Sequence, residues 1–149
     1  MTSEDAFRAG YAYVLEANVE WGDMDALGHV NNTVYFKYFE RVRIAWFRDL
    51  GWIAEESGPE VGPILASVRC RFRHALTYPD TILIGASLTD LEADRFLTTY
   101  GIFSRRLQKL AAEGDGLTVG FDYRNNRKAP IPETIHAKLR ALLGPGEAG

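Results

Sequence analysis

Alternating apolar and polar positions mark the beginning of the chain as a strand. In residues 11–21 every odd position is apolar or aromatic, whereas the acidic residues Glu16 and Glu20 fall on the even side. A period of two over this length is typical of a half-buried β-strand. The alternation is lost in residues 22–31, where glycine, aspartate and asparagine are frequent, so this segment is predicted to be a loop.

A helical period replaces the alternation after this loop. Apolar residues recur at spacings of three and four, and the charged residues lie largely off a stripe made of Tyr35, Tyr38, Phe39, Val42, Ala45, Trp46 and Leu50. This spacing predicts a long amphipathic helix that ends near Gly51. Asn31 or Asn32 is placed to cap its start, because an asparagine side chain accepts hydrogen bonds from free amides of the first turn.

Short-period segments follow the helix and are predicted to be strands: residues 63–76, 82–88, 95–107 and 117–123. Gly114-Asp115-Gly116 is predicted to form a turn or bulge before the last of them. Pro132 opens a short helix with Ile135, Leu139 and Leu142 on one side. Residues 1–9 and 144–149 are expected to be flexible.

The order of strand, long helix, run of strands and terminal helix predicts an α+β fold in which a mostly antiparallel sheet wraps the long helix. The length of 149 residues favours a single domain, 1–149.

Composition and charge exclude several classes of function and partner. The chain has 17 Lys and Arg against 20 Asp and Glu, and a net charge of −3 disfavours nucleic acid as the main partner. Because no apolar run is long enough to cross a bilayer and the N-terminus lacks a signal-peptide pattern, we expect a cytoplasmic protein with no membrane partner. The single cysteine, Cys70, cannot form an internal disulfide, and the scattered histidines predict no metal site.

One polar run, residues 25–35 (DALGHVNNTVY), carries candidate chemistry because it leads directly into the predicted long helix. The first turn of a helix offers free amides and a partial positive charge, which stabilise the charge that a carbonyl oxygen acquires when it is attacked. Asp25 lies just upstream and could act as a nucleophile or general base on such a carbonyl. The alternative is that Asp25 only accepts hydrogen bonds from loop amides, and the residues alone leave both readings open.

At these residues the sequence resembles the 4-hydroxybenzoyl-CoA thioesterase-like family of hotdog-fold acyl-CoA thioesterases. The shared pattern consists of Asp25, Gly28, Val30, Tyr35, Glu40 and Arg43, preceded by VEWGD at residues 19–23. Tyr78-Pro79-Asp80 and Pro130-Ile131-Pro132 match as well, so the resemblance spans nearly the whole domain. It implies the hotdog fold, with the sheet wrapped around the long helix, and hydrolysis of an acyl-CoA thioester.

The resemblance also implies roles for single residues. Asp25 matches the catalytic carboxylate, and Asn32 matches the position whose backbone N–H polarises the thioester carbonyl. His29 could orient a water or the acyl carbonyl, or its ring could bond the loop backbone. Asn31 and Asn32 stand where benzoyl-type members carry aromatic residues, which argues against an aromatic acyl group. Proteins of this family form homodimers with joined sheets, and often homotetramers.

Coenzyme A enters as part of the substrate, and no metal or redox cofactor is implied. Its phosphates need basic partners, for which Arg71, Arg73, Arg105 and Arg106 are the candidates, although a solvated sheet surface explains them equally well. Glu40 is expected to pair with Arg43 on the helix rather than to serve as a second acid.

The alternative function is a non-catalytic domain that binds acyl-CoA or an acyl carrier protein on the same fold, because a fold does not determine a function. A hotdog dehydratase is disfavoured, because the paired histidine and acid of that family are not found.

Overall fold

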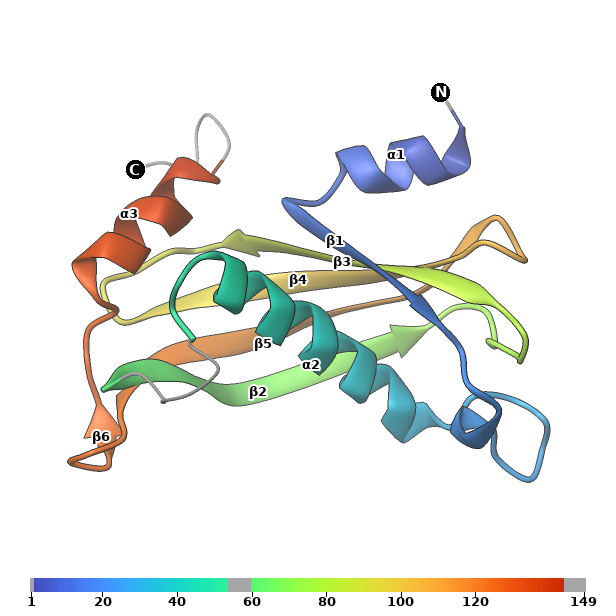
Figure 1. Cartoon of the computed structure of the whole chain (residues 1–149), viewed down its shortest axis with the longest axis horizontal. Helices are drawn as coiled ribbons and strands as arrows, with labels where there is room; N and C mark the ends of the chain where they lie inside the picture. Colours follow the sequence, from blue (N-terminus) through green and yellow to red (C-terminus); the bar gives the residue numbers. More distant parts are fainter. Residues whose placement is uncertain (1, 54–59, 144–149) are drawn as a thin grey trace.

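The computed structural model describes residues 2–53 and 60–143 as a curved sheet wrapped around one long helix (Figure 1). The elements in chain order are α1 (Ser3–Ala9), β1 (Tyr13–Asn18), the 3₁₀ turn η1 (Trp21–Asp23), α2 (Asn32–Asp49), β2 (Val61–Phe72), β3 (Thr81–Thr89), β4 (Arg95–Ser104), β5 (Lys109–Asp122), β6 (Arg127–Lys128) and α3 (Glu133–Ala141). The predicted residues 144–149 lie outside the described part. The α+β class and the short C-terminal helix after Pro132 are confirmed.

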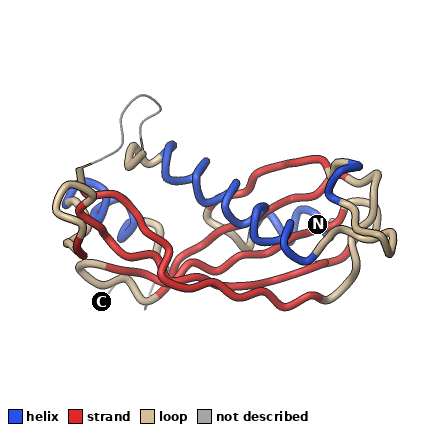
Figure 2. The backbone as a smooth tube through the Cα atoms, turned by 90° about the horizontal axis from the view of Figure 1, so that it is seen from below, coloured by secondary structure: helices blue, strands red, loops and turns tan. Residues whose placement is uncertain are grey.

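The strands form a six-stranded antiparallel sheet in the order β1-β3-β4-β5-β2, with β6 paired to β5. Helix α2 lies across the concave side of this sheet (Figure 2). Strands β1 and β2 are its edges, and β2 shifts register between Leu65 and Ser67. The predicted mostly antiparallel sheet around a central helix is therefore confirmed.

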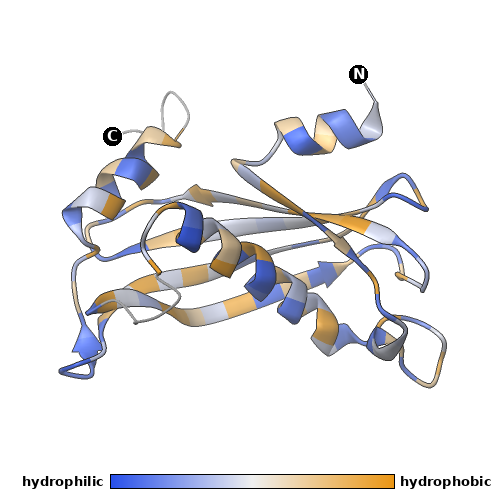
Figure 3. Ribbon diagram, in the orientation of Figure 1, coloured by the Kyte–Doolittle hydropathy of each residue, from blue (hydrophilic) through white to orange (hydrophobic). Residues whose placement is uncertain are grey.

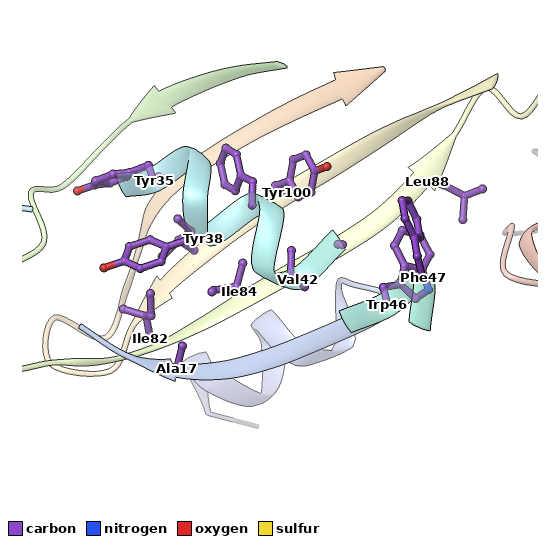
Figure 4. Packing of buried hydrophobic residues seen from close by; sticks show 14 of the residues in the cluster. Ala17, Tyr35, Tyr38, Val42, Trp46, Phe47, Ile82, Ile84, Leu88 and Tyr100 are labelled. Atoms are coloured by element: carbon purple, nitrogen blue, oxygen red, sulfur yellow. The ribbon is translucent and has the colours of Figure 1, made fainter. Parts of the chain in front are cut away.

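The main core lies between α2 and the concave side of the sheet. The Phe39 ring of α2 stacks on the Tyr100 ring of β4, with centroids 4.5 Å apart and planes inclined by 11°. Tyr38, Val42 and Trp46 follow one another along the buried side of α2 (Figure 4). Apolar residues are concentrated in stripes of α2 and in the long strands, whereas β6 is hydrophilic (Figure 3). This is the amphipathic pattern predicted for the helix.

A second, smaller apolar cluster lies on the opposite, convex face of the sheet. Phe7 of α1 packs there with Leu83 and Phe103, and Tyr11 covers two paired glycines, Gly85 and Gly101. The expectation that residues 1–9 are flexible is thus corrected, because residues 3–9 form α1 with a capping box between Thr2 and Asp5. The helix is held by burial of Phe7 rather than by any repeated apolar period.

The predicted turn or bulge at Gly114-Asp115-Gly116 is wrong, because β5 runs through these residues without a register shift. The chain reverses instead at residues 105–108, where Gln108 has a φ of 55°. Gly114 is needed for close packing: a Cβ there would collide with the carbonyl oxygen of Arg69 and lie 2.8 Å from the Phe39 ring. A glycine inside a strand often marks a position where a neighbouring group approaches the backbone closely.

Candidate active site

The loop before α2 closes on itself, which brings its two ends together. Met24 and Val30 form an isolated antiparallel bridge, and the Asp25 N–H donates to the His29 carbonyl over 2.8 Å. Gly28, between them, has a φ of 82°, a conformation that glycine adopts without steric cost. The predicted loop is confirmed, and Asp25 lies at the start of a compact turn that ends at the helix.

The two carboxylate oxygens of Asp25 have different surroundings. Oδ1 accepts from the backbone N–H groups of Leu27 at 2.8 Å and His29 at 3.3 Å. No group in the described part of the chain hydrogen-bonds to Oδ2. Asp25 is half-buried and lines a pocket of about 480 Å³ together with Trp21, Met24 and Tyr78. One oxygen therefore holds the loop, and the other remains available for chemistry.

The start of α2 leaves a backbone donor available as well. Asn31 is the N-cap: its Oδ1 accepts from the Thr33 N–H and the Thr33 hydroxyl, each over 3.0 Å. Asn32 is the first helical residue, and no described group accepts from its N–H. Such first-turn amides attract negative charge on an oxygen atom. The choice left open between Asn31 and Asn32 is thus decided: Asn31 caps, and Asn32 keeps its N–H free.

His29 takes part in the loop through its backbone. Its N–H and carbonyl both bond to Asp25, whereas its ring is exposed and makes no hydrogen bond with any described residue. Of the two alternatives for His29, the bond between its ring and the loop backbone is not found among the described residues, and the ring is exposed to solvent.

Two residues to which the sequence assigned no polar role anchor the loop. Asp23 Oδ2 accepts from the Tyr38 hydroxyl and from the Glu20 N–H, each over 2.9 Å. Burial, followed by the hydrogen bond to Asp23, raises the pKa of Tyr38, so its hydroxyl stays protonated and donates. Because Tyr38 lies on the apolar stripe of α2, its sequence position predicts only a core residue. Only its partner across the fold reveals the polar role of its hydroxyl.

Aromatic and apolar side chains around Asp25 are unusually exposed. Trp21, predicted as the last inward residue of the first strand, is 77% exposed, and Leu27 is 84% exposed. The cause is that β1 ends at Asn18 and the chain turns into η1, which interrupts the alternation. Trp21 therefore forms a wall of the Asp25 pocket instead of core.

The four candidate arginines separate into two pairs. Arg105 and Arg106 line a second pocket of about 480 Å³, which shares Tyr78 with the Asp25 pocket. Arg71 lies on β2 and Arg73 directly follows the last residue of that strand. Arg71 borders a pocket of about 530 Å³ beside Tyr11 on the convex face. The structure therefore brings only the first pair next to the Asp25 pocket.

Two of these four arginines, Arg73 and Arg105, already have acidic partners among the described residues. Arg105 bonds to Glu4 over 2.9 Å and to Glu16 over 2.8 Å, and these bonds raise its pKa. Arg73 pairs with Glu113. The Arg106 guanidinium donates to the Thr77 hydroxyl over 2.9 Å and has no carboxylate partner among the described residues, whereas the Arg106 backbone N–H donates to Asp80 Oδ1. Arg106 is thus the basic group near Asp25 that can take up an anion without breaking an ion pair.

The expected pair of Glu40 and Arg43 is not formed. Glu40 is exposed, whereas Arg43 is 9% exposed and donates to the Tyr100 hydroxyl over 3.0 Å. Residues three apart lie on neighbouring parts of a helix surface. Here, however, Arg43 faces the curved sheet and is buried, whereas Glu40 faces solvent.

Two further findings concern the residues 2–53 and 60–143. No three His, Cys, Asp or Glu side chains are grouped there in a way that could hold a metal ion. No helix in the same ranges combines the length and the apolar character that crossing a membrane requires.

Comparison with known proteins shows what this chain is similar to. The Pseudomonas aeruginosa protein PA2801, described as "a putative Thioesterase", is 29% identical with a TM-score of 0.79, over 87% of this chain and 98% of that one. A protein of Aquifex aeolicus (strain VF5) named "Putative esterase" is 25% identical over 131 residues, which cover 86% of this chain and 98% of that protein. The uncharacterized protein YsmA of Bacillus subtilis (strain 168) is 28% identical over 75 residues, and this match spans half of either chain.

The architecture is the hotdog fold of thioesterase neighbours, in which a curled antiparallel sheet surrounds a long helix. The model of the thioesterase-like superfamily matches residues 19–139, a range that runs from the strand before the Asp25 loop to the terminal helix. The chain belongs to the thioesterase-like superfamily.

Proposed function

We propose that this protein hydrolyses an acyl-CoA thioester to a free acid and coenzyme A, with Asp25 as nucleophile or general base. Membership of the thioesterase-like superfamily supports hydrolysis of an acyl-CoA thioester in general terms. The assignment to Asp25 rests on its Oδ2, which no described group hydrogen-bonds and which lies in a pocket. The loop that carries Asp25 leads directly to Asn32, whose backbone N–H has no described acceptor.

The two carboxylate oxygens of Asp25 have different roles in this proposal. Oδ1 stays bonded to the Leu27 and His29 amides and fixes the orientation of the group. Oδ2 either takes a proton from a water that attacks the thioester carbonyl, or attacks this carbon itself to form an acyl-enzyme anhydride, which a water then hydrolyses to the free acid and the Asp25 carboxylate. In both routes the carbonyl oxygen gains negative charge and accepts from the Asn32 N–H, and coenzyme A leaves as the thiolate. Thioesters are reactive enough for a carboxylate, an oxyanion donor and good positioning to suffice.

Arg106 is the residue we assign to the phosphates of coenzyme A. It has no described acidic partner, and its pocket adjoins the Asp25 pocket at Tyr78. Arg105 is already neutralised by Glu4 and Glu16, and a phosphate would have to compete with both. The His29 ring, which bonds to no described residue, is proposed to face the attacking water or the acyl carbonyl. Arg71 and Arg73 are given no role at this site.

We further propose that the functional unit is a homodimer formed through β2, alone or as half of a tetramer. The twelve-residue strand β2 is an edge of the sheet, and Ile64, Leu65 and Phe72 are exposed along it. A long edge strand with exposed apolar residues is a template for pairing with another strand. Pairing two copies of β2 would join their sheets and cover these side chains.

The decisive experiment measures thiol release from acetyl-, isobutyryl-, palmitoyl- and benzoyl-CoA by the parent protein, Asp25→Asn and Asp25→Ala. The asparagine retains an oxygen for the Leu27 and His29 amides, so the loop stays closed while the nucleophile or base is lost. We expect kcat to fall by at least about 100-fold in both variants. Asp90→Asn, on an exposed turn, is the matched control and should keep the parent rate.

Parent activity in both Asp25 variants would refute the role of this carboxylate. If the parent binds these acyl-CoA esters but hydrolyses none of them, the alternative of a non-catalytic binding domain is supported. The bonds of Oδ1 to the loop amides are the observation that favours this alternative, because they give Asp25 a purely structural use.

A further inference from the structure

Tyr38 connects the body of α2 to the loop that carries Asp25. Its side chain is 2% exposed and lies among the buried side chains between α2 and the sheet, near Ile82 (Figure 4). Its hydroxyl donates to Asp23 Oδ2 over 2.9 Å. In the described part of the chain, no other α2 side chain beyond the first turn hydrogen-bonds to residues 20–31. The bond is therefore the one polar tie from the helix body to this loop.

Asp23 in turn holds both ends of the loop. Its Oδ2 also accepts from the Glu20 N–H over 2.9 Å, at the end of the first strand. Its carbonyl accepts from the Asn31 N–H over 2.9 Å, at the start of the helix. Asp23 is two residues before Asp25, and Asn31 directly precedes Asn32. Asp23 thus bonds to the helix body through Tyr38, to Glu20 before the loop and to Asn31 directly before Asn32.

We infer that Tyr38 and Asp23 are positioning residues, which fix the Asp25 carboxylate relative to the first amide of α2. This inference rests on the function proposed above, and neither residue needs to contact the substrate. The tie matters because a carboxylate and an oxyanion donor act on the same carbonyl group. A shift of about 1 Å between such groups costs on the order of 100-fold in rate. In this loop Val30 and Met24 pack against the main core, whereas Trp21 and Leu27 are exposed.

The chain provides a matched control at the other end of the same helix. There the Tyr13 hydroxyl donates to Asp49 Oδ2 over 2.7 Å, which ties the C-terminal turn of α2 to β1. Tyr38→Phe and Tyr13→Phe each remove a single hydroxyl that bonds a single aspartate. Only the first change touches the Asp25 loop. A general loss of helix anchoring would affect both variants, whereas a positioning role affects one.

The kinetic test uses the acyl-CoA of the panel that the parent hydrolyses fastest. For Tyr38→Phe we expect kcat to fall about 10-fold or more while KM changes less than about threefold. Tyr13→Phe should stay within about twofold of the parent in kcat. Asp23→Asn should recover most of the activity that Asp23→Ala loses, because a single oxygen accepts both side-chain bonds and an amide oxygen can replace it.

A second measurement does not depend on catalysis. Hydrogen exchange of the Leu27 and His29 amides, which Asp25 Oδ1 protects, should be faster in Tyr38→Phe than in the parent and unchanged in Tyr13→Phe. A parent that hydrolyses no acyl-CoA would refute the proposed function, but the exchange rates would still test the tie. Parent kcat together with parent exchange rates in Tyr38→Phe would overturn the positioning role.

Discussion

Single residues in this protein are fixed by the neighbours that the fold brings to them, and Gly114 is an example. A Cβ at this position would meet both the Arg69 carbonyl oxygen of β2 and the Phe39 ring of α2. The Arg69 carbonyl oxygen belongs to the backbone and cannot rotate away. A methyl group at position 114 can therefore be accommodated only if β2 and β5 separate. A glycine that resembles a turn signal in the sequence is therefore a packing requirement in the structure.

We predict that Gly114→Ala lowers the free energy of unfolding by about 3 kcal/mol, as for other overpacked interiors. Gly22→Ala is the control, because a Cβ at Gly22 would meet no atom within 4 Å. Urea titration of both variants measures the difference. Equal midpoints for the two would contradict the close approach of β2 and β5 at this point.

The candidate site was predictable where its residues follow one another in the chain. Asp25 and Asn32 lie in one polar run that leads into a helix, and local rules for loops and helix starts locate both of them. Asp23 and Tyr38 were not predictable, because fifteen residues and a full loop separate the two partners of their bond. Arg43 shows the same limit: spacing assigns it to Glu40, but its hydrogen bond goes to a strand 57 positions away.

At the scale of elements, α2 and α1 differ in how much the sequence specifies. The apolar stripe of α2 predicts its length, and Gly51, with a φ of 82°, ends it as expected. Helix α1 has seven residues and buries only Phe7, so no period can appear in its sequence. Its stability comes from packing on the convex face of the sheet, which no local pattern encodes.

We predict that Phe7→Ala lowers the free energy of unfolding by about 3 kcal/mol, the usual cost of emptying a buried aromatic site. Arg8→Ala removes an exposed pair with Glu4 on the same helix and should change it by less than about 0.5 kcal/mol. Chemical denaturation compares the two. A Phe7→Ala protein as stable as the parent would show that α1 is not bound to the sheet.

At the scale of the whole molecule, the curvature of the sheet leaves β2 as a long edge. The strand contacts α2 little and exposes apolar side chains, although its sequence alternates like a half-buried strand. A second copy of the chain is the proposed partner for this edge.

We predict that the protein elutes with twice the mass of the 16.7-kDa chain, or a multiple of it, in light scattering coupled to size-exclusion chromatography. Leu65→Asp, on β2, should shift it towards the monomer, because a buried charge at the strand interface has no partner. Leu107→Asp is the control: Leu107 is 40% exposed against 37% for Leu65, but it lies on the hairpin between β4 and β5. An unchanged mass for Leu65→Asp would contradict dimerisation through β2.

The sequence by itself determined what depends on near neighbours in the chain: the class of each long element, the loop before α2 with a cap at one of two asparagines, and the candidate carboxylate. Hydrophobic period and capping act over a few residues, so one linear pattern contains them. The tertiary structure alone decided the meaning of Gly114, the place of α1, the partner of Tyr38 and the separation of Arg106 from Arg71. Each of these depends on contacts between distant segments, and those contacts exist only once the curved sheet has closed around α2.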